Sequence, residues 1–212
     1  MATSLVDTIA QSMSSGLISR FSAATGESAS HVQTGLSAAV RAITASMAMR
    51  ADDPEAMAQI HAMAVEPAND LSLPDRTEGL VSRAISGSSQ VTSSDFIQSL
   101  LLGNRTSNMA DSLASDAGVS KATARSMFSI ATSLVLSSLG KVIRTDRLDS
   151  AALSSRLADE RESIVAGLPA GLSKFYPSVG ATAQDVAATI PSRAPVAAAR
   201  VATAEKQRTA WT

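Results

Sequence analysis

The sequence predicts an all-α protein, and two observations support this fold class. Aromatic residues make up only 3% of the 212 residues, while the apolar 45% consists largely of Ala, Leu, Val, Ile and Met. Ala and Leu are strong helix formers. In addition, no segment alternates Val, Ile, Thr or Tyr with polar residues at the period of two that marks a strand. We therefore expect helices packed as one compact bundle.

Helix boundaries are visible along most of the chain. Ser28 and Ser120 each follow a Gly by two residues, and their hydroxyl groups can accept a hydrogen bond from a first-turn amide. Asp53 can cap a helix in the same way before Pro54, whose missing N–H costs nothing at the first helical position. Asp149 is a further N-cap. These features and the apolar periodicity predict helices near residues 4–14, 16–25, 28–50, 54–65, 76–86, 93–102, 105–117, 120–143 and 150–167.

Two parts of the chain share one pattern. Gly26 and Gly118 each stand before a Ser and a long amphipathic segment, at an offset of 92 residues (118 minus 26). The same offset pairs apolar residues at core-type positions: Ile9 with Leu101, Leu17 with Met109, Phe21 with Leu113, Leu36 with Phe128, Ile43 with Val135 and Met47 with Leu139. This pattern indicates an internal duplication. We expect two related helical units, near residues 1–66 and 92–168, within a domain of residues 1–176.

Residues 177–212 differ in composition from the rest. No Leu follows Leu172, and Ala, Thr, Val and Pro dominate the segment. Such a segment cannot bury enough apolar surface to offset the entropy lost on ordering. We therefore expect a flexible C-terminal tail.

Charge and composition exclude several classes of protein. Eighteen Lys and Arg residues against nineteen Asp and Glu residues give a net charge of −1, whereas proteins that coat DNA carry a basic excess. The chain has no Cys, which excludes disulfides and fits a reducing cytoplasm. Its N-terminus lacks the features of a secretory signal, and the best apolar segment, residues 129–140, is short and interrupted by Ser. We expect a soluble, cytoplasmic protein with no membrane partner.

Several segments together resemble a known family. They are Leu100 to Arg105 (LLLGNR), the turn at Gly118 (GVSKA), and Leu157 to Leu172 with its Arg161, Leu168, Pro169 and Gly171. The segments resemble the bacterial proteins catalogued only as "domain of unknown function 937", and the resemblance covers roughly residues 1–176. It implies a helical protein without an assigned activity.

The segment LASDAGVSKATARSMF is also similar to the helix-turn-helix of lactose-repressor-like regulators. It matches that motif at Ala114, Gly118, Val119 and Ser120. In such a motif the helix after the turn enters the major groove of DNA. The resemblance therefore implies that Lys121, Thr123 and Arg125 would face DNA.

A structural interpretation of the same segment competes with DNA binding. Any short turn between two packed helices requires a small residue, a Gly and a capping Ser. The helix after the turn is apolar along Phe128, Val135 and Leu139, as a core helix is. The duplicate segment, SAATGESASHV, keeps its Gly and Ser but lacks the basic residues. We therefore interpret Gly26 and Gly118 as structural corners and favour this interpretation over DNA binding.

Catalytic and metal-binding patterns have little support. Ser138 and Lys141 have the Ser-x-x-Lys spacing of serine acylases, but the other elements of that chemistry are missing from the sequence. His31 and His61 are the two histidines, and neither has a second ligand at metal-binding spacing, so we expect no metal and no cofactor. We interpret the charged residues 156–162 as a solvated helix face with ion pairs between successive turns.

These observations predict a non-enzymatic helical module that acts by binding a protein partner or by self-association. The alternative hypothesis is a DNA-associated helix-turn-helix protein that uses Lys121–Arg125. A hydrolase ranks third.

Overall fold

The computed structural model describes residues 5–10, 13–67, 79–82, 84–85 and 93–176. Every element of regular structure within these ranges is a helix, so the predicted all-α class is confirmed. The elements are α1 (Leu5–Ala10), α2 (Ser15–Thr25), α3 (Ala29–Ala48), α4 (Pro54–Val65), α6 (Ser93–Leu102), a short 3-10 helix (Gly103–Arg105), α7 (Thr106–Ala117), α8 (Lys121–Asp146), α9 (Ser150–Ala166) and α10 (Ala170–Ser173). Residues 79–82 and 84–85 are also helical.

The contacts between residues divide the chain into two units, Met1–Tyr176 and Pro177–Thr212. The tail expected at residues 177–212 lies outside the described residues. Parts of the helix expected near residues 76–86 lie outside them as well. All described residues belong to the first unit.

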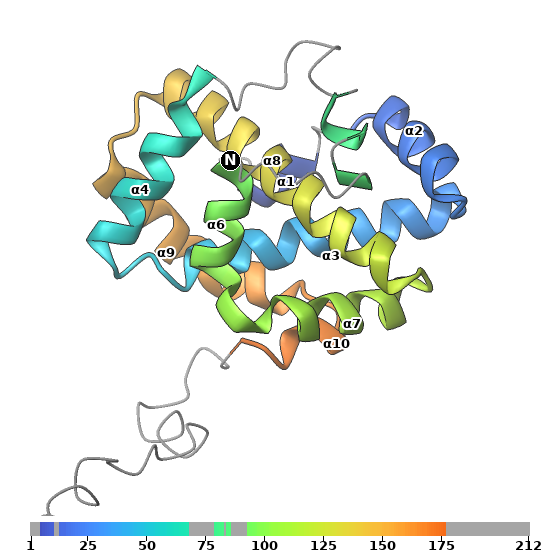
Figure 1. Ribbon diagram of the computed structural model, residues 1–212. Coiled ribbons are helices and arrows are strands. Elements are labelled where there is room, and N and C mark those ends of the chain that lie inside the picture. The colour runs from blue at the N-terminus through green and yellow to red at the C-terminus, as the bar shows by residue number, and fades with distance from the viewer. Residues whose placement is uncertain (1–4, 11–12, 68–78, 83, 86–92, 177–212) are drawn as a thin grey trace, which may run out of the picture. The chain divides into compact units, whose positions relative to one another are not determined.

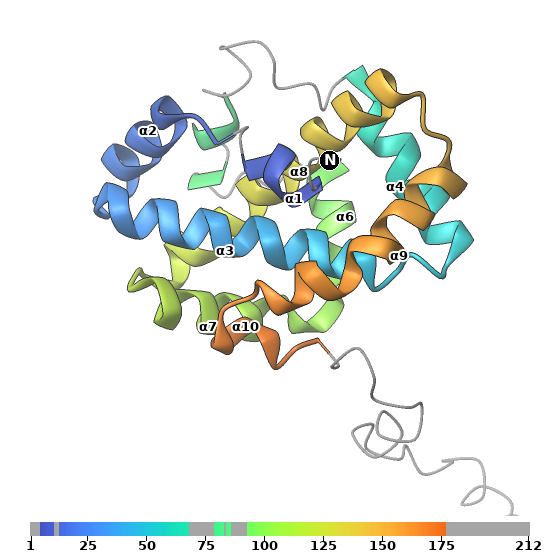
Figure 2. The ribbon, with the colours of Figure 1, turned by 180° about the vertical axis from the view of Figure 1, so that it is seen from behind.

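The two longest helices, α3 and α8, form the centre of this unit and make its most extensive contact (Figure 1). Helix α4 packs against α8, helix α9 packs against α3, and α4 and α9 also contact each other. Helix α7 contacts both central helices near their N-terminal ends. Viewed from behind, α3 crosses the middle of the unit with α9 beside it, while α10 lies next to α7 (Figure 2). One continuous core results, since the buried apolar residues of the described helices form a single cluster.

The apolar stripes expected on α3 and α8 face this core. Ile43 on α3 and Leu139 on α8 are both fully buried, with 0% of their surface exposed. The close packing depends on small residues as well. A Cβ atom built on Gly140 of α8 would overlap the backbone carbonyl of Ala64 in α4. The two helix backbones therefore approach each other at a distance that only Gly permits.

Three features differ from the sequence-based expectation: the end of α1, the end of α8 and the presence of α10. Helix α1 ends at Ala10, and residues 13–14, expected in the first helix, are not helical. Helix α8 continues three residues past position 143 and ends at Asp146, followed by Arg147 in the left-handed conformation with φ of 52°. Left-handed C-caps are usually Gly or Asn, so an Arg in this role leaves no sequence signature. Helix α10 (Ala170–Ser173) was not expected at all, because four residues are too few to show an apolar period.

Tyr176 fixes the end of the first unit to the core. Its hydroxyl donates a hydrogen bond to the carbonyl oxygen of Ala42 at 2.6 Å and lies 2.9 Å from the hydroxyl oxygen of Ser46. Burial raises the pKa of the Tyr176 phenol to about 12, although the hydrogen bond from Ser46 and the charge of Arg105 act in the opposite direction. The guanidinium of Arg105 also donates to the carbonyl oxygen of Phe175 at 2.9 Å.

Among the described residues, one helix, Lys121–Asp146, is long and apolar enough to cross a membrane by length and composition. This helix extends beyond residues 129–140, the apolar segment identified in the sequence. In the structure, 78% of its apolar window is buried inside the protein, as expected for a central core helix.

Candidate functional site

Two turns between helices have the same local structure. We call residues 25–28, between α2 and α3, the first corner, and residues 117–120, between α7 and α8, the second corner. Gly26 and Gly118 cap the preceding helices in the left-handed conformation, with φ of 74° and 67°. Ser28 and Ser120 then cap the following helices by accepting a hydrogen bond from the backbone N–H three residues later. At each corner a left-handed Gly thus ends one helix and a Ser caps the start of the next.

The two corners lie next to each other in space. The carboxylate of Glu27 in the first corner accepts a hydrogen bond from the backbone N–H of Ser120 in the second corner, at 2.9 Å. A Cβ atom on Gly118 would lie 3.6 Å from the imidazole ring of His31, whereas a Cβ on Gly26 would meet nothing within 4 Å. The corners therefore share a conformation but differ in surroundings, and a negative charge occupies the N-terminal end of α8.

The three residues of the DNA-binding hypothesis do not form one exposed face. Lys121 donates to the carboxylate of Asp111 at 2.9 Å. Thr123 is only 6% exposed, and its hydroxyl oxygen lies 2.8 Å from that of Ser120. Thr123 thus belongs to the cap of α8 and does not face outward, contrary to what the resemblance implied. Arg125 is exposed.

The other sequence patterns are separated by the fold. Ser138 is buried while Lys141 is exposed, so the Ser-x-x-Lys spacing places these residues in different environments. His61 contacts the carbonyl oxygen of Leu148 through Nε2 at 2.9 Å, and His31 lies beside the second corner. Within the part of the chain that the structure describes, no group of three His, Asp or Glu residues is placed to hold a metal ion.

The charged stretch of α9 connects helices, and our interpretation of it as a solvated face was incomplete. Arg161 donates to the carbonyl oxygen of Ala48 at the end of α3 at 2.9 Å and to the carboxylate of Asp52 at 2.7 Å. Arg156 pairs with Glu160 one turn later at 3.4 Å, as expected, and also with Asp146 at the end of α8 at 3.0 Å. These side chains hold α9 against the ends of both central helices.

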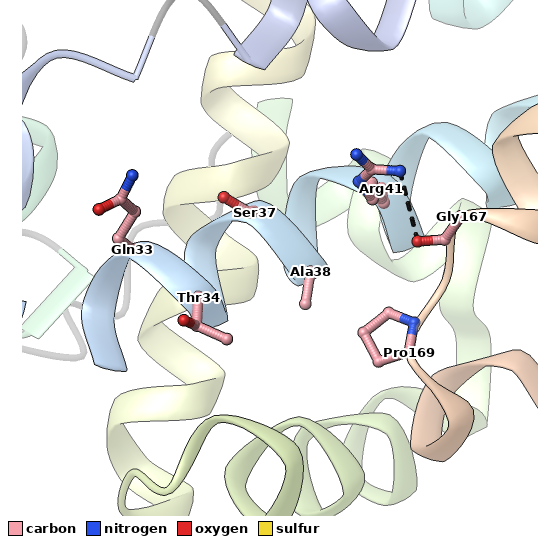
Figure 3. A pocket seen from close by; sticks show the side chains of 7 residues that line it. All are labelled: Gln33, Thr34, Ser37, Ala38, Arg41, Gly167 and Pro169. Carbon is pink, nitrogen blue, oxygen red and sulfur yellow. Dashed lines mark hydrogen bonds between the residues drawn. The ribbon is translucent and has the colours of Figure 1, made fainter. Parts of the chain in front are cut away.

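An open groove lies on the outer side of α3, and we call it the α3 groove. It has a volume of about 360 Å³ and is lined by Gln33, Thr34, Ser37, Ala38, Arg41, Gly167 and Pro169. In Figure 3, Thr34 and Ala38 lie on the side of α3 toward Pro169, and Gln33 and Ser37 lie on its other side. Arg41 and Gly167 are joined by a hydrogen bond. The guanidinium of Arg41 donates to the carbonyl oxygen of Gly167 at 3.3 Å.

Several polar side chains line the α3 groove. Within the described residues, the side chains of Gln33, Thr34 and Ser37 form no hydrogen bond with the protein. Arg41 has no carboxylate partner in the same part of the chain, although its guanidinium carries five N–H donors. These residues have no signature in the sequence, because polar side chains on the outer face of a helix have the same pattern whether they bind a ligand or only water.

The comparisons with known proteins connect the chain with one family. Residues 7–142 match the model of a family described as "Bacterial protein of unknown function (DUF937)". The match includes both corners and the LLLGNR segment but not residues 157–172, where part of the resemblance was expected. No curated protein and no solved structure matches the chain. Because the family model covers 136 of the 212 residues, this chain belongs to the bacterial DUF937 family.

Proposed function

We propose that this protein is a non-enzymatic interaction module that binds a segment of another protein in the α3 groove. The observation that supports this proposal best is the row of Gln33, Thr34 and Ser37, whose side chains form no hydrogen bond within the described residues. Ala38 and Pro169 supply an apolar surface beside these polar groups. Binding sites commonly combine an apolar surface with a few polar groups that fix the orientation of the ligand. In agreement with the lack of Cys, we place the module in the cytoplasm.

We further propose that the module arose by an internal duplication of two helical units. All twelve residues of the six pairs at the offset of 92 are buried, with at most 2% of their surface exposed. The helix starts follow this offset to within one residue, since α2 and α3 begin at residues 15 and 29 while α7 and α8 begin at residues 106 and 121. The shared caps of the two corners support the same conclusion.

The DNA-binding alternative has less support. An approaching phosphate at the N-terminal end of α8 would meet the carboxylate of Glu27. Lys121 is already engaged by Asp111, which leaves Arg125 as an exposed cation near this end. Since affinity for DNA depends on several neutralised phosphates, this arrangement favours the interaction module.

Peptide binding tests the proposed function directly. Random peptides of about twelve residues are displayed and selected on the purified protein, since extended segments are a common mode of recognition. An enriched peptide is then labelled, and its affinity is measured by fluorescence anisotropy. We expect Ser37→Trp, which fills the α3 groove, to abolish binding.

The matched control is Ser155→Trp on the exposed side of α9, about 18 Å along that helix from Gly167. This control should bind like the parent protein. Thr34→Arg is a second groove-filling variant, for use if Ser37→Trp lowers the melting temperature. A selection that enriches no peptide, or binding that survives both groove variants, would contradict the proposal.

A further inference from the structure

Arg41 defines the chemistry of the α3 groove. It is the charged residue among the seven that line the groove, and it lies at the end formed by Gly167 and Pro169. We infer that the α3 groove binds an extended peptide whose acidic side chain pairs with Arg41. This inference rests on the proposed function and names the class of its partner.

The position of Arg41 suits recognition of a carboxylate. Its hydrogen bond to the Gly167 carbonyl holds the guanidinium at the edge of the groove and uses one N–H donor. A planar guanidinium can bind a carboxylate through two parallel hydrogen bonds, which makes this pair strong and directional. Other arginines of the described residues, such as Arg156 and Arg161, already have carboxylate partners within the protein. Arg41 has none there, so its charge is available for an acidic ligand.

The spacing of the polar side chains favours an extended peptide. Gln33, Ser37 and Arg41 follow one another at intervals of four residues on α3, which corresponds to about 6 Å along the helix for each interval. An extended peptide rises about 3.3 Å per residue, so side chains on one of its faces recur every 6–7 Å. When an acidic side chain of the peptide pairs with Arg41, the peptide residues two and four positions away therefore lie beside Ser37 and Gln33. The amide and the hydroxyl can each donate and accept hydrogen bonds there.

The apolar part of the groove limits the size of the intervening residues. Ala38 is 5% exposed and lies on the side of α3 that faces Pro169. The Pro ring has a fixed backbone φ and forms a rigid wall at this point. We therefore expect small apolar residues between the acidic and polar positions of the bound peptide.

The composition of the selected peptides provides the first test. Peptides enriched on the parent protein should share an Asp or Glu, with hydrogen-bonding residues two or four positions away. Replacing this acidic residue by its amide should weaken binding about tenfold or more, because a charge-assisted pair becomes a neutral one. The protein is unchanged in this comparison, so folding cannot explain the loss.

Variants of Arg41 provide the second test. Arg41→Gln should weaken binding of the acidic peptide as much as the amide replacement in the peptide does. The Arg41→Gln protein should then bind the acidic and the amide peptide equally, because both changes remove the same interaction. Arg125→Gln, which removes an exposed arginine outside the groove, should leave the affinity unchanged. Increasing the salt concentration should weaken binding to the parent protein more than to Arg41→Gln.

The outcomes separate this inference from the proposed function. If Ser37→Trp abolishes binding while the amide peptide binds as well as the acidic one, the groove is a protein-binding site but Arg41 does not select a carboxylate. In that case the inference is wrong and the proposed function stands. If binding survives the groove-filling variants, both are wrong.

Discussion

Tyr176 should make the stability of the protein fall with pH in the alkaline range. The phenol is 6% exposed and donates to the backbone carbonyl oxygen of Ala42, and burial raises its pKa from 10.0 to about 12. In the unfolded chain the phenol loses its proton near pH 10, whereas the folded protein retains it. Above that pH the unfolded state binds fewer protons, so the free energy of unfolding falls as pH rises. A difference of about two pKa units corresponds to about 2.7 kcal/mol, lost between roughly pH 10 and 12.

Urea unfolding followed by circular dichroism measures this loss. The parent protein and Tyr176→Phe are compared at several pH values from about 8 to 11.5, a window that spans the titration of the unfolded phenol. At the lower end Tyr176→Phe should be less stable by about 1 kcal/mol, because it lacks the buried hydrogen bond. The gap should close and then reverse as pH rises, since the variant cannot ionise. Parallel pH dependence in the two proteins would show that Tyr176 is not buried as described.

Three further predictions concern the helix contacts and the second corner. Gly140→Ala should destabilise the protein by about 1–3 kcal/mol, because its Cβ would overlap a backbone carbonyl of α4. The control Gly16→Ala, whose Cβ would have room, should change the melting temperature little or raise it; equal losses would contradict the close contact. Gly118→Val should lower the free energy of unfolding by at least about 1–2 kcal/mol, because its φ is 67°, and an unchanged melting curve would refute the left-handed cap. The double variant Lys121→Ala, Arg125→Ala should have nearly the same melting temperature as the parent protein. In an electrophoretic mobility assay, neither protein should show sequence-specific binding to DNA.

Helix boundaries could be predicted where their chemistry is local. Asp53 and Asp149 accept hydrogen bonds from the N–H of the third following residue, as the sequence suggested. The same holds for Ser28 and Ser120. A cap needs only a hydroxyl or carboxylate beside a free amide, and both lie within four residues of each other in the sequence. The C-terminal end of α8 could not be predicted in this way, because Arg147 takes the left-handed position that Gly usually occupies.

Contacts between distant residues could not be predicted in the same way. Arg161 contacts Ala48 and Asp52, which lie more than one hundred residues earlier in the chain. A single sequence shows the charge of Arg161 but not the helix end that it meets. The solvated face predicted for this stretch therefore missed the contacts between helices that the arginines make.

The candidate site depends on the same kind of distant contact. Gln33, Ser37 and Arg41 belong to α3, while Gly167 and Pro169 approach from the connection between α9 and α10. Nothing in the local pattern distinguishes Arg41 from any exposed arginine. Its significance comes from the carbonyl oxygen of Gly167, 126 residues away, and from the lack of a carboxylate beside it within the described residues.

The charges around the second corner and in the α3 groove favour different ligands. DNA-binding helices use their free N-terminal amides and nearby cations to hold phosphates. Here the carboxylate of Glu27 accepts a hydrogen bond from the N–H of Ser120, and Asp111 pairs with Lys121, so two carboxylates from neighbouring elements already lie beside the second corner. The α3 groove has the opposite arrangement, because Arg41 carries a charge without a carboxylate partner in the described residues. One such cation can neutralise one carboxylate of a peptide, but it would release only about one counterion from a duplex. An acidic protein segment is therefore the ligand that this distribution of charge favours.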